Sequence, residues 1–274
     1  KMNLLKPLYN QEYISPEKAL EELRKYNPEE DKLGDDKHED EKDKGVISRD
    51  FSLEELADSY RITGVNYRNG VYAVDLYKEL LSSRTQEQHA ESKKHIIANN
   101  TNEFYAPTYP EINAIALTLF QNKDAPQYRQ LIEQLRQFIK DSALNNWLTT
   151  LTSFRYNPEN QEDVIIHNHK QQDQYEIKLD SLVGTDGFIL DPNTTNVLTP
   201  IQALLDTKQS MQEINQVYKW LTDKDAYIWR LNSTPNKSVE TVARFYVYFG
   251  WVGFGFSGGP DGSSRAFGVR RAKN

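Results

Sequence analysis

The chain has 274 residues, of which 38% are hydrophobic, and its mean hydropathy is −0.75. No apolar run approaches the roughly 20 residues that a membrane helix needs, so the chain is not expected to span a membrane. It contains no cysteine, which excludes disulfides, thiolate nucleophiles and cysteine metal sites. The net charge is −7, but nine acids and four lysines fall in residues 29–44, so the remainder is nearly neutral and lacks the basic stripe that nucleic-acid binding requires.

The first 47 residues are expected to form a short helix and a linker. Ser15, Pro16 and Glu17 give an N-cap followed by proline in the first turn, which predicts a helix over residues 15–26. The acidic run at residues 29–44 is typical of a solvated linker. The first ten residues lack the long apolar run and cleavage site of a secretory signal. The compartment stays open, with a cell surface or a virion as alternatives.

Residues 48–160 are predicted to be mainly helical. Ser52 opens a capping-box sequence that is followed by apolar residues at helical spacing. A second helix is expected after Tyr109, and a third begins near Asp124. The third helix carries one apolar stripe, made of Tyr128, Leu131, Ile132, Leu135, Phe138 and Ile139.

Residues 161–274 change to a strand-rich pattern. Asp163–His167 and Tyr175–Val183 are predicted strands. Thr199 and Pro200, as an N-cap and first helical residue, predict the start of one or two amphipathic helices. Strand, helices and a strand-rich end make an α+β fold. The last predicted strands are Tyr227–Leu231, Tyr246–Phe256 and Ala266–Arg271.

The segment from Phe245 to Phe256 differs most from an ordinary core sequence. Seven of its twelve residues are aromatic, and seven of the 13 glycines of the chain lie between Gly250 and Gly268. Rigid aromatics beside glycines, which leave the backbone adaptable, are typical of antibody-like binding surfaces. A packed core instead favours branched aliphatic side chains that interlock. We therefore expect this segment to be exposed and to bind a ligand.

The terminal sequence AFGVRRAKN, preceded by a glycine-rich loop and by Trp229 and Trp251, resembles the closing strand of prokaryotic C-type-lectin-like domains. These domains commonly end on a glycine-hydrophobic-arginine motif. Within that group, the chain is similar to the variable proteins of diversity-generating retroelements. The resemblance implies a C-type-lectin-like domain over residues 161–274 and a hypervariable, ligand-binding region over residues 227–261. The helical region at residues 48–160 has no counterpart in it.

The resemblance also implies which residues vary. Template adenines are mutated in these systems, so variable positions draw on a set that includes Tyr, Ser, Gly, Val and Arg but not Trp. Trp251 is therefore expected to be a scaffold residue, together with the phenylalanines between residues 245 and 256. The expected ligand-binding residues are Tyr227, Ile228, Arg230, Arg244, Tyr246, Val247, Tyr248, Gly250, Val252, Gly253, Gly255, Ser257 and Gly259.

Two alternatives stay open. Alternating aromatics are ordinary strand formers, so Tyr246, Tyr248, Phe254 and Phe256 could instead form the two faces of a buried sheet. The chain could also be a structural component of a virion or cell surface whose C-terminal domain forms a fixed oligomer interface. Exposure of Arg244, Tyr246 and Tyr248 together would favour a receptor over both alternatives.

Other chemistry has less support. His167 and His169 could share a metal from one strand face, but a third ligand is hard to find among five histidines, and a polar loop pair is preferred. Residues 258–264 lack the lysine of a phosphate-binding loop. Formylglycine-generating enzymes share the terminal motif but need active-site cysteines. Because this chain has no cysteine, that activity is excluded. For one group of side chains with oxygen ligands of the kind calcium uses, we prefer roles in turns and helix caps to calcium binding. These residues are Asp180, Asp186, Asp191, Asn193 and Asn196.

The sequence therefore predicts a non-enzymatic binding protein that needs no cofactor. A broad aromatic face suits a large partner better than a metabolite, so we expect a macromolecular ligand, in the first instance a protein. No nucleic-acid partner is expected. The oligomeric state is not predicted.

Overall fold

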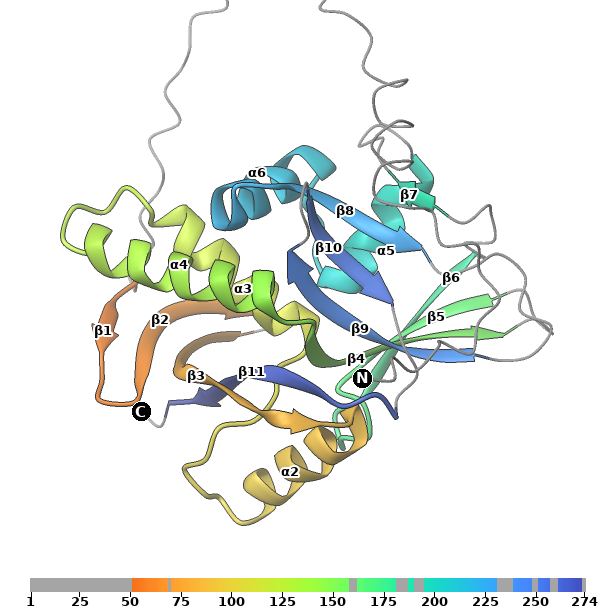
Figure 1. Cartoon of the computed structure of the whole chain (residues 1–274), viewed down its shortest axis with the longest axis horizontal. Helices are drawn as coiled ribbons and strands as arrows, with labels where there is room; N and C mark the ends of the chain where they lie inside the picture. Colours follow the sequence, from red (N-terminus) through yellow and green to blue (C-terminus); the bar gives the residue numbers. More distant parts are fainter. Residues whose placement is uncertain are drawn as a thin grey trace, which may run out of the picture. The chain divides into compact units, whose positions relative to one another are not determined.

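The computed structural model shows a mixed α+β fold (Figure 1). In the part of the chain that is described, no helix is long and apolar enough to cross a membrane. The predicted helix at residues 15–26 and the acidic run at residues 29–44 lie outside the described residues. The described residues are 51–68, 70–157, 162–180, 187–189, 195–230, 239–247, 251–256 and 261–272.

In the described residues, strands come before, between and after the helices. The first strands lead into three helices, and the C-terminal half contains two more helices among its strands. In chain order the elements are β1 (Leu53–Glu55), β2 (Ser59–Tyr67), β3 (Gly70–Arg84), α2 (Gln86–Ala98), α3 (Tyr109–Gln121), α4 (Arg129–Asn145), β4 (Leu148–Asn157), β5 (Glu162–His167), β6 (Tyr175–Asp180), β7 (Gly187–Ile189), α5 (Thr195–Leu205), α6 (Met211–Thr222), β8 (Asp225–Arg230), β9 (Val239–Val247), β10 (Trp251–Phe256) and β11 (Ser264–Arg271).

The first sheet has the strand order β1-β2-β3-β11. All neighbours in this sheet are antiparallel. The helix predicted from Ser52 is therefore wrong, because β1 and β2 occupy that segment. Leu53 pairs with Ile62 of β2, and both side chains are buried. Pairing between strands outweighs the local capping-box signal here.

Helices α3 and α4 confirm two predictions. Helix α3 begins at Tyr109 behind the N-cap Thr108 and carries Pro110 in its first turn. Helix α4 begins at Arg129, somewhat later than the predicted start near Asp124. In Figure 1 both helices run along one side of the first sheet. The predicted stripe of α4 is buried at Ile132, Leu135 and Ile139.

The second sheet has the strand order β6-β5-β4-β9-β10-β8-β7. The strands predicted at residues 163–167 and 175–183 are confirmed as β5 and β6, although residues 181–183 lie outside the described part. The predicted strand Tyr246–Phe256 is two strands, since β9 already begins at Val239 and β10 begins at Trp251. Strand β10 pairs antiparallel with β9 and parallel with β8.

Helices α5 and α6 are both present, but one of them begins earlier than expected. Helix α5 begins at Thr195 and contains Pro200 in its interior, so the predicted start at Pro200 is wrong. Helix α6 begins at Met211, and its N-cap residue Ser210 forms a capping box with Glu213. The buried residues of α6 include Met211, Ile214, Val217, Tyr218 and Leu221.

The predicted domain boundary at residue 160 does not divide the structure. Gly45–Asn274 form one compact unit, because β3 pairs with β11 and β4 pairs with β9. The fully buried ring of Phe245 in β9 shows how the core is shared. It lies 6.2 Å, between ring centroids, from each of Tyr109, Tyr218 and Phe267, which belong to α3, α6 and β11. Helices α3 and α6 therefore share the main hydrophobic core with the C-terminal strands β9 and β11.

Glycine in the terminal motif is required by a close approach between β11 and its neighbours. A Cβ atom at Gly268 would lie 3.0 Å from the Cβ of Tyr77 and 3.1 Å from the Cβ of Phe104. Both of these atoms sit next to the backbone and cannot easily move away. Any larger residue at position 268 would thus push β11 away from β3.

Arginine in the same motif ties β11 to the first sheet through one buried carboxylate. Arg270 Nη2 donates to Asp75 Oδ2 at 2.9 Å, and Arg61 Nε donates to Asp75 Oδ1 at 2.8 Å. The carboxylate of Asp75 is buried, while Arg270 also donates to the carbonyl of Asn102. A charge inside the protein needs such paired hydrogen bonds. Asp75 therefore joins β2, β3 and β11, and we call Arg61, Asp75 and Arg270 the arginine clamp.

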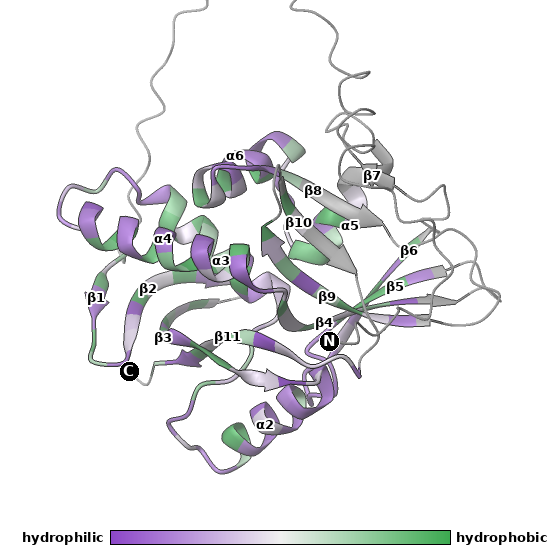
Figure 2. Cartoon of the chain, in the orientation of Figure 1, coloured by the Kyte–Doolittle hydropathy of each residue, from purple (hydrophilic) through white to green (hydrophobic). Residues whose placement is uncertain are grey.

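Helix α2 is mostly hydrophilic, as Figure 2 shows, and it buries a polar face. Its buried residues include Gln86, His89 and Lys93. The amide of Gln86 donates to the carbonyls of Thr150 and Thr152 at 2.9 and 3.0 Å. Buried polar groups are stable only with such partners, so specific hydrogen bonds hold α2 against β4.

Candidate functional site

Strand β9 carries three predicted ligand-binding residues whose side chains are described, and all three are buried. Arg244 is 6% exposed, Tyr246 is 3% exposed and Val247 is 5% exposed. The expectation that Arg244 and Tyr246 lie exposed together is therefore wrong. Strand β9 lies inside the seven-stranded sheet, between β4 and β10. For this strand the alternative of a sheet buried on both faces describes the structure better.

One face of β9 and β10 belongs to the scaffold. Val247 pairs with Val252 of β10, and both side chains are part of the main hydrophobic core. Ala243 and Phe245 of β9 share that core. The prediction that Val247 and Val252 contact a ligand is wrong, because both point into the interior.

The other face carries aromatic and arginine side chains beside glycines. Side chains alternate along a strand, so Arg244 and Tyr246 lie on the face opposite Val247. Tyr246 pairs with Gly253 of β10, and Arg244 pairs with Gly255. Gly253 also pairs with Tyr227 of β8. The positions of Tyr246, Gly253 and Tyr227 thus form one row across three neighbouring strands, with a glycine in the middle.

Arg244 is held by the start of β11. Its guanidinium donates to the hydroxyl of Ser264 and to the carbonyl of Gly262. Burial lowers the pKa of Arg244. These hydrogen bonds link β9 to β11, so the described contacts of Arg244 are structural.

Trp147 extends the row by one strand and is its exposed end. The residue directly precedes β4, which neighbours β9 in the sheet. Its ring stacks on Tyr246 with centroids 4.8 Å apart and planes at 14°. Trp147 is 50% exposed and Leu144, at the end of α4, is 52% exposed. We call Leu144, Trp147 and the supporting Tyr246 the Trp147 surface.

Trp147 is not among the expected ligand-binding residues, because it lies outside the expected binding region at residues 227–261. One signal was present in the sequence. Trp147 follows Asn145 and Asn146 at the end of a helix, where a large aromatic residue has polar neighbours. Only the pairing of β4 with β9, however, brings it to Tyr246.

Several predicted residues cannot be placed as side chains. Tyr227, Ile228 and Arg230 lie in β8, and Gly255 in β10, with only their backbone described. Tyr248, Gly250, Ser257 and Gly259 lie outside the described residues. Of the possible calcium ligands, Asp186, Asp191 and Asn193 lie outside them too, and the side chains of Asp180 and Asn196 are not described.

His167 is a core histidine at the end of β5. Its Nε2 lies 2.9 Å from the carbonyl oxygen of Ala203 and its Nδ1 lies 3.0 Å from the hydroxyl of Thr152. Because a carbonyl only accepts, Nε2 carries the proton and Nδ1 accepts from Thr152. Burial lowers the pKa of His167 to about 4. The ring is therefore neutral near pH 7, with both nitrogens used.

His169 does not join His167 in a metal site. Its Nδ1 lies 3.4 Å from the carboxylate of Glu240, and burial lowers its pKa. Within the described ranges, no group of three or more histidine, aspartate or glutamate side chains is placed to hold a metal ion. The two histidines are structural in the contacts that they make.

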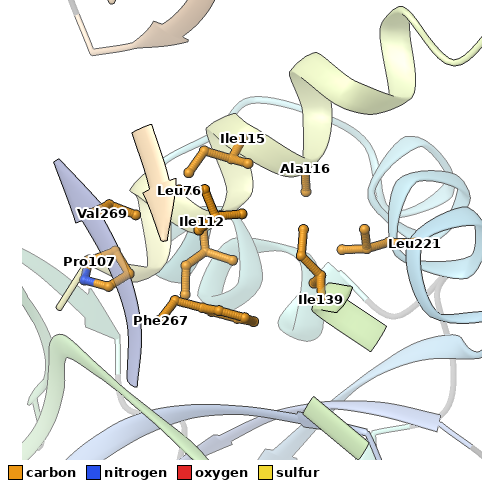
Figure 3. A pocket seen from close by; sticks show the side chains of 9 residues that line it. All are labelled: Leu76, Pro107, Ile112, Ile115, Ala116, Ile139, Leu221, Phe267 and Val269. Carbon is orange, nitrogen blue, oxygen red and sulfur yellow. The ribbon is translucent and has the colours of Figure 1, made fainter. Parts of the chain in front are cut away.

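The interior contains a small apolar cavity of about 10 Å³ between α3, α4, α6 and the first sheet (Figure 3). This volume suits about one water molecule, and the walls offer that water no polar side chain. The cavity is therefore a gap in the core rather than a ligand site. Its lining residues are Leu76, Pro107, Ile112, Ile115, Ala116, Ile139, Leu221, Phe267 and Val269.

Three comparisons with known proteins give no further guide to the site. No family model matches the chain, and no curated protein or solved structure matches it. The function is therefore inferred from the geometry of the Trp147 surface and of strands β8 to β10.

Proposed function

We propose that the chain is a non-enzymatic, receptor-like binding protein that presents the Trp147 surface to a macromolecular partner. The observation that carries this proposal is the half-exposed ring of Trp147 stacked on the buried ring of Tyr246. Tyr246 fixes the tryptophan from below, so little side-chain freedom is lost when a partner covers it. Tryptophan is also among the residues that most often dominate the energy of an interface.

The Trp147 surface is open rather than enclosed. Trp147 and Leu144 are about half exposed, whereas Tyr246 and Gly253 behind them are buried. An exposed aromatic ring on an open face suits a protein or another large ligand, whereas small molecules bind in enclosed pockets.

The scaffold is stabilised away from this surface, which supports a role in displaying variable residues. The arginine clamp and Gly268 hold the closing strand β11 against β3. This use of the terminal motif supports the proposed C-type-lectin-like assignment. In the proposal, hypervariable positions lie within residues 227–261 but do not include Val247 and Val252, which the core requires.

A serine in place of Trp147 tests the binding proposal. The purified protein, immobilised and exposed to an extract of cells from its natural surroundings, is expected to retain one macromolecule reproducibly. Trp147→Ser should weaken that retention about tenfold or more, since it removes a central aromatic anchor. Binding is measured by titrating the extract and quantifying the retained partner by mass spectrometry.

The matched control is Ile97→Ser, because Ile97 is 59% exposed on α2, an element that is not part of the Trp147 surface. This variant should bind like the wild type. Equal retention by both variants, or retention of no partner, would contradict the proposal. Self-association of the wild type that Trp147→Ser abolishes, measured by sedimentation, would instead indicate a fixed oligomer interface.

A further inference from the structure

Lysine is rarely buried without a purpose or a partner, and α2 carries Lys93 into the interior. The buried residues of this helix recur at intervals of three and four, and Lys93 is one of them. It is only 5% exposed. Its ammonium group lies 4.5 Å from the ring centroid of Tyr105. The amine is therefore enclosed between α2 and the body of the protein.

Two side chains from distant parts of the chain meet this amine. Lys93 Nζ lies 3.2 Å from Asn168 Oδ1 and 3.7 Å from Glu111 Oε2. Asn168 follows β5, and Glu111 is in the first turn of α3. An amine, a primary amide and a carboxylate thus share one enclosed space.

The amide is held in a fixed position. Asn168 is 2% exposed and adopts a left-handed backbone conformation with φ of 55°, which asparagine tolerates better than most residues. Its Nδ2 donates to Asp173 Oδ2 at 3.0 Å. The amide therefore presents its oxygen to Lys93 and its nitrogen to a second carboxylate.

The carboxylate beside the amine is fixed as well. Glu111 Oε2 accepts hydrogen bonds from the backbone N–H and the hydroxyl of Thr108, at 2.8 and 3.2 Å. The bond from the backbone N–H belongs to the capping box at the start of α3, whose other half is the Glu111 N–H donating to Thr108 Oγ1. Because the amide of Asn168 and the carboxylate of Glu111 are both held beside the amine of Lys93, much of the entropic barrier to a reaction between these groups is already removed.

We propose that Lys93 and Asn168 condense to an intramolecular isopeptide bond. The Nζ of Lys93 attacks the side-chain carbonyl carbon of Asn168, a new C–N bond forms, and the bond from that carbon to Nδ2 breaks. Lys93 gives up two protons from its ammonium form. Both end on the departing nitrogen, which leaves as an ammonium ion. Charge and atoms balance, and no oxidant, metal or cofactor is consumed.

The two carboxylates assist the proton transfers that an unreactive amide needs. Glu111, beside Nζ, is the base that takes a proton from the attacking amine. Asp173 accepts a hydrogen bond from Nδ2 and holds the leaving nitrogen in place, and the protons released by Lys93 pass to that nitrogen as its bond to the carbonyl carbon breaks. The ring of Tyr105 covers the amine on one side and limits competing attack by water. Glu111 and Asp173 touch the reacting atoms and are in this sense catalytic residues.

The product would be a covalent cross-link within the chain, which has no cysteine and so cannot form a disulfide. Lys93 and Asn168 are 75 residues apart, so the bond closes a long loop that includes α3, α4 and β4. A cross-link of this kind stabilises a fold mainly by restricting the unfolded chain. The reaction does not depend on the proposed binding function.

Intact-mass spectrometry of the full, folded chain under denaturing conditions tests the bond. The wild type is expected to be lighter than its sequence by one molecule of ammonia. Trypsin cannot cleave after an acylated lysine, so digestion should release a branched peptide that joins residues 85–94 to residues 156–170. Asn168→Ala and Glu111→Gln should both show the full sequence mass.

Lys94→Arg is the matched control, because Lys94 is the exposed neighbour of Lys93 on the same helix. This variant should keep the mass deficit. A folded wild type that has the full sequence mass after days of incubation would overturn the proposal. A deficit without the branched peptide would also overturn it, since an asparagine that forms a succinimide loses the same mass.

Discussion

Asp75→Asn is expected to destabilise the protein by about 3 kcal/mol, measured as the free energy of unfolding in urea. The substitution keeps the shape of the side chain but removes the charge that Arg61 and Arg270 share. Arg270 is mostly buried, with 12% of its side chain exposed. A buried cation that loses its partner typically costs about 3–5 kcal/mol. Part of this is recovered here, because Arg61 is partly exposed to water and Arg270 keeps Asp58 at 4.0 Å between Nη2 and Oδ1.

Glu55→Gln gives the matched comparison. Glu55 forms an ion pair with Lys78 on the same sheet, at 2.8 Å between Nζ and Oε1, but its side chain is 52% exposed. Exposed pairs of this kind contribute about 1 kcal/mol or less. If the two variants lose equal amounts of unfolding free energy, the arginine clamp contributes no more to stability than an exposed ion pair.

The free energy of unfolding is expected to fall by about 2 kcal/mol between about pH 7 and about pH 5, mainly because of His167. Burial lowers its pKa in the folded state from 6.5 to about 4. As the pH falls below 6.5, the unfolded chain therefore binds a proton that the folded chain does not bind. This stabilisation is complete above the unfolded pKa and is lost progressively down to the folded pKa. Urea unfolding at several pH values measures the slope.

Two histidine variants identify the source of this slope. His167→Asn should flatten it, although not completely, because burial also lowers the pKa of His89 and His169. His95→Gln should leave it unchanged, since His95 lies exposed on α2. A wild type that is equally stable at both pH values would mean that His167 is protonated inside the fold.

Elements whose local signals agree with their tertiary contacts could be predicted from the sequence. Helix α3 has its N-cap, its early proline and its apolar face in register, and β5 is a short apolar run that becomes a buried strand. The segment after Ser52 has the same capping signal, yet pairing of Leu53 with Ile62 makes it a strand. That pairing depends on a neighbour that local patterns do not specify.

The surface could be predicted only in part. Phe245 was expected to be scaffold and lies in the core, and the strands that carry the aromatic segment are present. The burial of Tyr246 and the exposure of Trp147 depend on β4 lying beside β9. Lys93, Glu111 and Asn168 likewise meet only after three separate elements fold together, so no spacing in the sequence indicates them.

Sequencing many natural copies of the gene tests the central claim most directly, because it needs no knowledge of the partner. If the protein displays variable residues, substitutions are expected to be concentrated within residues 227–261. Within that region the core residues Phe245, Val247 and Val252 should stay unchanged, as should Trp147, Asp75 and Arg270 outside it. Substitutions spread evenly along the chain, or as frequent at Val247 and Val252 as at their neighbours, would contradict the proposed division between scaffold and binding surface.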